Sequence, residues 1–480
     1  MTTNISNRLF ILVLSHFNEF SGNRASTFSI IFSRVQTADS SVSIKINGLK
    51  SNMTTENYVA YIGIDWADRK HDIALYDCAS KTWQESIIQT RPQDILDWVN
   101  QLRARYGEGK IAVGMEQKRG PLLYALCQYD NLVLFPINPR TVANYRKAFQ
   151  PSRAKSDPVD ARLLVELMQK HPDKLERWVA GCPQTRALRQ WVESRRMLVG
   201  EKVRLTNRIT ASLKSYFPQL LDWFEDKDTL VFCEFIEQFP SVGAAQAATP
   251  EQLTQFFRAH KVIRKSAINR RIQQIQEAGP PLTRDEAIVL PAQALTRTLI
   301  ALLKVILNQL TDFNAKIADL FEALPDAQLF ADLPGAGPHL APRLLVAFGA
   351  ERDRFASAQA FMSYVGIAPV KEESGKKRWV HWRWSCPIFL RQTFVEWTNQ
   401  SRRFSPWAQA FYLQQKRAGK SHQKAIRALA YKWGRILWRC WQDQTAYDEE
   451  KYLAALARKN SPLIKFLGTT TTEAQTIESV

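Results

Sequence analysis

The chain has 480 residues, of which 45% are hydrophobic and 23% charged, the composition of a globular protein with two or three domains. Its formal net charge of +19 favours a polyanionic partner, and nucleic acid is the commonest. No stretch approaches the roughly 20 apolar residues of a membrane-spanning helix, and six cysteines spaced singly argue against a zinc site and a disulfide framework, which favours a reducing, cytoplasmic compartment.

The first 52 residues differ from the rest of the chain. They contain one short apolar run, Leu9–Leu14, followed by a Ser/Asn/Thr-rich stretch without sustained periodicity. The run is too short to span a bilayer and lacks a cleavage site, so we do not expect a signal peptide. We expect residues 1–52 to be an upstream extension with Met53 as the natural start; a disordered arm is the alternative.

Two short apolar segments, Tyr58–Trp66 and His71–Tyr76, flank a tight polar turn and predict a β-hairpin. The first segment presents a carboxylate, Asp65, where a buried sheet would have its edge. A charge there is costly unless it is paired or binds a metal. A simple turn carboxylate is the alternative.

The next segments predict a strand at 82–89, a helix at 92–106, a strand at 111–116, a helix near 122–129 and a strand at 132–135. This order favours an α/β layer fold with a mixed sheet. The strand at 111–116 again ends in a carboxylate, Glu116, which would also suit a solvent-facing position.

A helix start follows at Asp157-Pro158-Val159-Asp160. Asp157 suits the N-cap and Asp160 the third helical position, so helix capping explains both. The two residues also lie on one helical face and could share a cation. Basic residues precede them, and we expect these to contact nucleic acid: Arg140, Arg153 and Lys155.

Taken together, Asp65, Glu116, Asp157 and Asp160 can hold two divalent ions about 3.5–4 Å apart, which suits phosphodiester exchange. The expected ion is Mg²⁺, with Mn²⁺ as an alternative. The arrangement resembles the RuvC-like branch of the ribonuclease H fold, with its Asp-Glu-Asp-Asp set. We therefore expect a RuvC-like domain at 53–175.

Residues 176–325 predict a helical arm. Two long amphipathic segments, 184–214 and about 284–324, could pair as an antiparallel coiled coil. Shorter helices separated by prolines lie between them, at 217–281. The basic face of the first segment suits a solvated surface, a nucleic-acid contact or a dimer arm, and the sequence leaves these open.

The segment Leu333-Pro334-Gly335-Ala336-Gly337-Pro338 joins two helix-like runs. Gly335 and Gly337 would let backbone amides approach a phosphate at the next helix. This pattern resembles the hairpin of helix-hairpin-helix DNA-binding proteins; a plain helix–turn–helix corner is the alternative.

A serine followed by glycine, Ser374-Gly375, lies in a basic loop with phosphate-binding candidates Lys376, Lys377, Arg378 and Arg383. Residues 371–440 contain 16 Lys/Arg against 3 Glu, and 7 of the 14 tryptophans. Interleaved cations and aromatics favour nucleic-acid contacts, although many of these tryptophans should be core residues. The expected domain at 326–445 is mostly α-helical, with a tail at 446–480.

The motifs Tyr-Ile-Gly-Ile-Asp, Lys-Ser-Asp-Pro-Val-Asp-Ala, Leu-Pro-Gly-Ala-Gly-Pro and Gly-Ile-Ala-Pro-x4-Ser-Gly occur in this order. Together they resemble the insertion sequence 110 family of transposases, over residues 57–445. The resemblance implies that Asp65, Glu116, Asp157 and Asp160 bind Mg²⁺ and that Ser374 forms a transient phosphoserine link to DNA. It also implies target and donor DNA, a structured non-coding RNA, a homo-oligomer from dimer to tetramer, no membrane, and action at the bacterial nucleoid.

Two departures from the family pattern concern the arm and the segment after the serine. Residues 217–281 look like an insertion, and Cys386–Arg391 replaces the usual Gly-Asn before Leu-Arg; Arg391 stays a nucleic-acid candidate. Two other functions stay open. One is a two-metal nuclease or junction resolvase that uses only the carboxylates, and the other is a non-catalytic nucleic-acid-binding protein.

Overall fold

The computed structural model describes residues 57–117, 119–149, 157–375 and 377–467, without the side chains of Asp157 and Lys465. The expected extension at 1–52 and the candidates Arg153, Lys155 and Lys376 lie outside the described residues. The chain forms two compact units, Met1–Trp178 and Val179–Val480. The finer division into domains stays a prediction.

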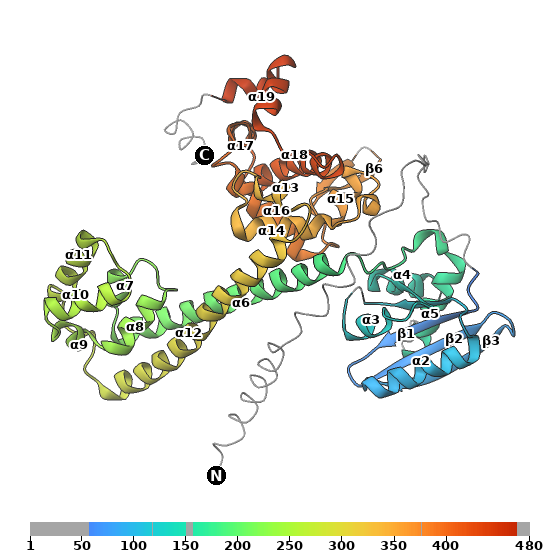
Figure 1. Ribbon diagram of the computed structural model, residues 1–480, viewed down its shortest axis with the longest axis horizontal. Helices are drawn as coiled ribbons and strands as arrows, with labels where there is room; N and C mark the ends of the chain where they lie inside the picture. Colours follow the sequence, from blue (N-terminus) through green and yellow to red (C-terminus); the bar gives the residue numbers. More distant parts are fainter. Residues whose placement is uncertain (1–56, 118, 150–156, 376, 468–480) are drawn as a thin grey trace, which may run out of the picture. The chain divides into compact units, whose positions relative to one another are not determined.

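Unit 1 is built on a five-stranded mixed sheet (Figure 1). The strands are β1 (Ala60–Trp66), β2 (Lys70–Asp77), β3 (Thr82–Gln89), β4 (Ile111–Met115) and β5 (Leu132–Pro136), in the order β3-β2-β1-β4-β5. The first three form antiparallel pairs, and β1, β4 and β5 run parallel. This confirms the predicted α/β fold with a mixed sheet.

Helices cover both faces of the sheet in unit 1. Helices α2 (Pro92–Tyr106) and α3 (Pro121–Leu126) pack on the face of Ile62 and Val113. Helices α4 (Pro139–Phe149) and α5 (Asp157–Lys170) pack on the opposite face. This three-layer arrangement is consistent with a RuvC-like fold.

Helix α5 crosses the sheet over two glycines that are neighbours in register, Gly63 on β1 and Gly114 on β4. A Cβ atom on Gly63 would lie 1.9 Å from the backbone oxygen of Ala161, and one on Gly114 would lie 2.9 Å from Met168 Cε. Only glycine admits a helix this close to the strands. The first turn of α5 therefore lies near the carboxyl end of β1.

Unit 2 begins with a two-helix arm (Figure 1). Helices α6 (Pro183–Tyr216) and α12 (Glu286–Glu322) run antiparallel, because Trp191 contacts Phe313 at one end and Ser212 hydrogen-bonds Thr296 at 2.8 Å toward the other. The two predicted arm helices are confirmed.

Short helices gather at one end of the arm and enclose an aromatic core, and we call residues 217–281 the tip module (Figure 1). They are α7 (Leu220–Trp223), α8 (Leu230–Gln238), α9 (Val242–Gln246), α10 (Pro250–Ala259) and α11 (Lys265–Gln276). Leu213 of α6 and Leu299, Ile300 and Leu303 of α12 complete the core. The tip module is thus packed onto the arm.

The other end of the arm packs into a helical body. Its elements are α13 (Ala327–Ala331), α14 (Gly337–Phe348), α15 (Ala358–Tyr364), the hairpin β6 (Val370–Ser374) and β7 (Lys377–His381), α16 (Ile388–Ser401), α17 (Pro406–Arg417), α18 (His422–Gln442) and α19 (Glu449–Arg458). Trp397, Trp407 and Trp433 are fully buried, as expected for part of the tryptophan set. Leu463, in the expected tail, is also part of this core.

Among the described helices, α12 is long and apolar enough to cross a membrane by length and composition alone, since an 18-residue stretch of it has a mean hydropathy of 1.5. Our statement that no stretch approaches this length was wrong in that respect. A single such helix is weak evidence for a membrane span, and α12 pairs with α6 through Leu299, Ile300 and Leu303 and their neighbours.

Candidate active site

Two of the predicted carboxylates end neighbouring parallel strands on the same face of the sheet. In β1, Gly63 faces α5, and side chains alternate along a strand, so Asp65 faces the same side. In β4 the same applies to Gly114 and Glu116. Ile64 is in register with Met115, which brings the next residues, Asp65 and Glu116, side by side at the carboxyl edge.

Asp160 comes from the first turn of α5, one residue before the contact between Ala161 and Gly63. It is buried and forms an ion pair with Arg146 of α4. Asp157 is the first residue of α5, but its side chain lies outside the described residues. Within the described part of the chain, no three His, Cys, Asp or Glu side chains converge closely enough to hold a metal ion.

Sequence reasoning missed one carboxylate of this face, Asp72. It lies directly opposite Asp65 across the β1–β2 hairpin and is 5% exposed. Like charges directly opposite each other destabilise a strand pair, and Lys70 Nζ, 3.4 Å from Asp72 Oδ2, offsets part of this repulsion. The hairpin register could have revealed Asp72, because a turn after Trp66 pairs Asp65 with the sixth or seventh residue after it.

The donor chemistry of this edge fits a hard cation. Mg²⁺ in nucleotide- and phosphate-processing sites is commonly held by one or two carboxylates, with water and substrate phosphates completing its octahedron. Asp65 and Glu116 supply two such carboxylates. Asp160 could add a third carboxylate through Oδ2, because its ion pair with Arg146 involves Oδ1.

The predicted nucleophile Ser374 belongs to unit 2, at the tip of the β6–β7 hairpin. Its side chain is exposed, and its hydroxyl makes no hydrogen bond to any described residue. Gly375 follows with φ +55°, the left-handed conformation that a tight turn needs. The hairpin thus presents an exposed serine side chain next to its turn.

Ser374 shares one face of the hairpin with Lys377, its direct partner across the strands, and with the pair Glu372–His381. His381 Nε2 lies 2.6 Å from Glu372 Oε1, and Trp379 Nε1 donates to Glu372 at 3.0 Å. The hydrogen bond to Glu372 raises the pKa of His381 above its ordinary value. Lys377 therefore places a positive charge beside Ser374 on this face, next to the Glu372–His381 pair.

The other basic candidates in unit 2 make internal contacts. Arg378 lies on the opposite hairpin face, 3.0 Å from Glu373. Arg383 donates to the backbone oxygen of Ala368 at 3.3 Å. Arg391 donates to the backbone oxygen of Arg383 at 2.9 Å and stacks over Trp382.

The remaining described nucleic-acid candidates are Arg140 and the two glycines. Arg140 is exposed at the start of α4. Gly335 has φ +71°, and a Cβ there would lie 2.9 Å from Phe404, so packing explains this glycine. Gly337 has φ +54° and borders open space. A helix–turn–helix corner is present; its assignment as a DNA-binding hairpin stays a prediction.

Comparison with known protein families gives two matches, the first of which includes most of unit 1 and the arm helix α6. Residues 62–218 match the DEDD model for IS110, described as a transposase. Residues 327–413 match the model described as the transposase IS116/IS110/IS902 family. The first match includes Asp65, Glu116, Asp157 and Asp160, and the second includes Ser374.

Several curated proteins are similar along most of the chain. The mini-circle protein of IS117 from Streptomyces coelicolor, named as a transposase, is 28% identical over 84% of this chain and 99% of its own length. The 42 kDa protein of insertion element IS900 from Mycobacterium paratuberculosis is 24% identical, over 73% of this chain and 86% of its own. The 43.6 kDa protein of insertion element IS110 from Streptomyces coelicolor is also 24% identical, over 82% and 96%.

The fold, the acidic sheet edge and these matches define a transposase, an enzyme that cleaves and recombines DNA. A transposase domain of the DEDD type also suggests use of a divalent metal in general. The chain belongs to the IS110 family of transposases.

Proposed function

We propose that the chain is a site-specific recombinase that exchanges DNA strands through a covalent link to Ser374 and requires Mg²⁺. The observation that carries the proposal is an exposed serine hydroxyl, without a partner among described residues, directly across the hairpin from Lys377. In unit 1, Asp65 and Glu116 would hold the cation, which when bound stabilises charge on the phosphodiester and its leaving oxygen.

The proposed reaction conserves the energy of the phosphodiester. The Ser374 oxygen attacks phosphorus, a serine–phosphate ester forms, and the bond to one deoxyribose oxygen breaks. The hydroxyl proton leaves to solvent or a nearby base, and the released deoxyribose oxygen takes up a proton. Attack by a deoxyribose hydroxyl of another strand on the ester then restores the serine. Lys377 would orient the phosphate on the hairpin face.

The proposal includes two kinds of partner beyond DNA. A structured RNA from the element would select target and donor by base pairing, and several copies of the chain would act together, from dimer to tetramer. The family resemblance supports both. Neither the +19 charge nor the lysine beside Ser374 distinguishes RNA from DNA.

Covalent trapping tests the proposal. Full-length protein, element RNA and DNA are incubated with Mg²⁺ and analysed under denaturing conditions for protein-linked DNA. We expect Ser374→Ala to abolish the linked species and Ser421→Ala, an exposed serine whose side chain does not cap α18, to retain it. Linked DNA from Ser374→Ala would overturn the assignment.

The same variants separate the alternative functions. A nuclease or resolvase that uses only carboxylates predicts strand cleavage that survives Ser374→Ala and disappears in Asp65→Asn. A non-catalytic binding protein predicts DNA binding without cleavage in any metal. The proposed recombinase loses the full exchange reaction in both variants, while DNA binding persists.

A further inference from the structure

The tip module segregates its charges along the chain. From Asp222 to Glu251 there are seven acidic residues and one lysine, whereas from Gln252 to Gln276 there are six basic residues and no acidic one. Acidic residues of the first group pair with the arm: Lys202 with Asp228 at 2.6 Å, and Lys304 with Glu234 and Glu237 at 2.8 Å. The lysines of the arm thus neutralise part of the negative charge of residues 222–251, and they do not neutralise the positive charge of residues 252–276.

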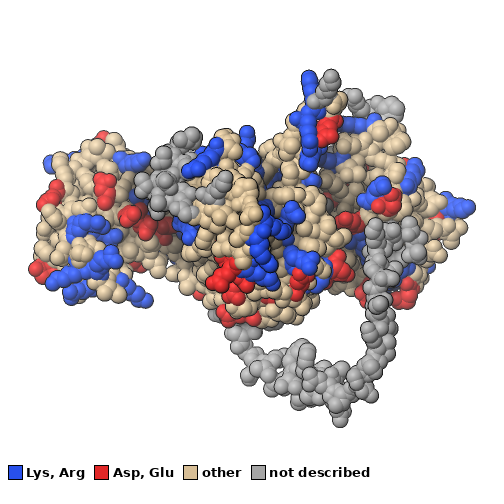
Figure 2. All heavy atoms as spheres, turned by 90° about the horizontal axis from the view of Figure 1, so that it is seen from above, with Lys and Arg blue, Asp and Glu red and all other residues tan. Residues whose placement is uncertain are grey.

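Five of the six basic side chains are exposed and surround the turn between α10 and α11; we call them the basic corner. They are Arg258, Lys261, Arg264, Lys265 and Arg270. None of the five forms an ion pair within the described part of the chain. The sixth, Arg271, is excluded because it donates to the backbone of Trp223 and stacks on Phe224. Figure 2 shows Lys and Arg gathered over this end of the arm.

The turn that bears the basic corner is fixed by the module's core. Lys261 has φ +61°, and Val262 N donates to the backbone oxygen of Phe257 at 2.9 Å, the hydrogen bond that closes a helix C-terminus. Phe257 is fully buried. The backbone of the turn is therefore anchored, and its charges project from a defined position.

An apolar side chain projects from the same turn. Ile263 is 92% exposed, between Lys261 and Arg264. Such exposure gains nothing for folding, because the side chain buries almost no area. DNA-binding proteins that contact the minor groove combine basic residues with an apolar side chain that inserts at a base step.

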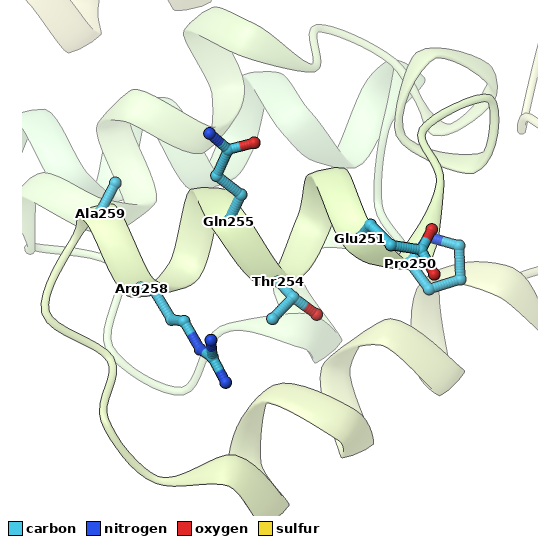
Figure 3. Close-up of a pocket in the computed structure, with 6 residues that line it drawn as sticks. All are labelled: Pro250, Glu251, Thr254, Gln255, Arg258 and Ala259. Atoms are coloured by element: carbon cyan, nitrogen blue, oxygen red, sulfur yellow. The ribbon is translucent and has the colours of Figure 1, made fainter.

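The start of α11 adds backbone donors. Arg264 is its N-cap residue, no side chain caps the helix, and its first turn contains no acidic residue. Uncapped N–H groups at a helix start can donate hydrogen bonds to phosphate oxygens. Next to the corner, α10 borders an open hollow of about 660 Å³ lined in part by Thr254 and Arg258, which point to the same side of the helix (Figure 3).

We infer that the basic corner of the tip module docks on the backbone of duplex DNA, with Ile263 against a groove. Phosphates would contact the five cations and the first amides of α11. The inference rests on the DNA-acting class of the chain and not on the proposed serine chemistry. Except for its first two residues, the module lies in the stretch between the two family matches, residues 219–326, and the proposed contact therefore extends DNA binding beyond them.

The test measures binding of the full-length protein to a short duplex of unrelated sequence, without divalent metal, across a salt series. We expect Lys261→Gln/Arg264→Gln/Lys265→Gln to bind at least about tenfold more weakly near physiological salt, and to lower the slope of log K against log salt by about 2–3, or about 0.9 per lost phosphate contact. A matched control with the same charge change, Lys451→Gln/Arg458→Gln/Lys459→Gln on and just after α19, should behave like wild type.

A second variant separates the apolar contact from charge. Ile263→Ser should weaken duplex binding several-fold without changing the salt slope, because no counterion is released by this side chain. Because the mutated side chains are exposed, circular dichroism should be unchanged in all variants. Equal affinity and slope for the corner and control variants would overturn the proposal. So would a defect confined to single-stranded or structured RNA. Both outcomes leave covalent trapping at Ser374 unaffected.

Discussion

Gly63 has the strictest steric requirement in unit 1. Its hypothetical Cβ would lie 1.9 Å from the backbone oxygen of Ala161, and a backbone atom of a packed helix cannot turn away as a side chain does. Any side chain at this position therefore pushes α5 off the sheet. That displacement would move Asp160 away from Asp65.

We predict that Gly63→Ala lowers the free energy of unfolding of unit 1 by about 1–3 kcal/mol, the usual cost of overpacking. Urea denaturation of the full chain, followed by far-UV circular dichroism, measures it. Gly243→Ala is the control, because its Cβ would meet nothing within 4 Å and α9 gains an alanine. A Gly63→Ala protein as stable as wild type would contradict the close helix contact.

The acidic residues show where sequence reasoning succeeds and fails. Asp65 and Glu116 could be placed at strand ends from apolar periodicity alone, and parallel pairing then makes them neighbours. The Arg146–Asp160 pair could not be anticipated, because it depends on how α4 packs beside α5. Asp72 was missed because strand register, and not residue type, decides that it faces Asp65.

At the scale of elements, few side-chain interactions between described residues stabilise the β6–β7 hairpin. It is exposed along both strands, and its side-chain contacts include the pairs Glu372–His381 and Glu373–Arg378 on opposite faces. The hairpin face that bears Ser374 is thus held by the Glu372–His381 pair, whose strength depends on the protonation of His381.

We predict that Glu372→Gln lowers the pKa of His381 toward its ordinary value, since the carboxylate hydrogen bond is what raises it. In wild type, the Glu372–His381 pair stabilises the folded hairpin fully at pH values below the ordinary histidine pKa. This stabilisation is lost as the pH rises through the raised pKa of His381. An NMR titration of the His381 ring measures the shift. Glu373→Gln, on the other face, should leave the titration unchanged; an equal shift in both variants would contradict the pairing.

The arm is stabilised where α12 meets α6 and the tip module. Leu303 is fully buried there, whereas its neighbour Leu302 is 51% exposed. We predict that Leu303→Ala costs about 2–5 kcal/mol of unfolding free energy, the cost of a cavity in a packed core. Leu302→Ala should cost less than about 1 kcal/mol. Similar losses for both, measured by denaturant titration, would show that the arm is packed differently.

The helices of the arm could be predicted from hydrophobic periodicity, because the helical repeat is sustained over long segments. The hairpin that bears Ser374 could not be predicted in this way, because its strands are mostly exposed and polar and show no alternation of apolar residues. The same limit applies to the glycines near 335. Composition suggested a phosphate-binding turn, but the packing of Gly335 against Phe404 depends on α16 and its following turn.

At the scale of the whole molecule, the two units have separate cores. The sheet of unit 1 forms two clusters with its helices, and the arm, tip module and helical body of unit 2 form two others. We predict two calorimetric unfolding transitions. Gly63→Ala should lower the midpoint temperature of one transition, and Leu303→Ala should lower that of the other. Transitions that move together in both variants would show that the units unfold cooperatively.

The paired glycines under α5 have a consequence for comparing and redesigning such proteins. At Gly63 the backbone of Ala161 lies directly on the strand, so the distance between α5 and β1 does not depend on the volume of a strand side chain there; at Gly114 the side chain of Met168 fills the space that the glycine leaves. Core side chains elsewhere can change while the acidic edge keeps its spacing. Two glycines in register on parallel strands, each two residues before a carboxylate, therefore form a pattern by which the same layout can be recognised, or transplanted, without overall sequence similarity.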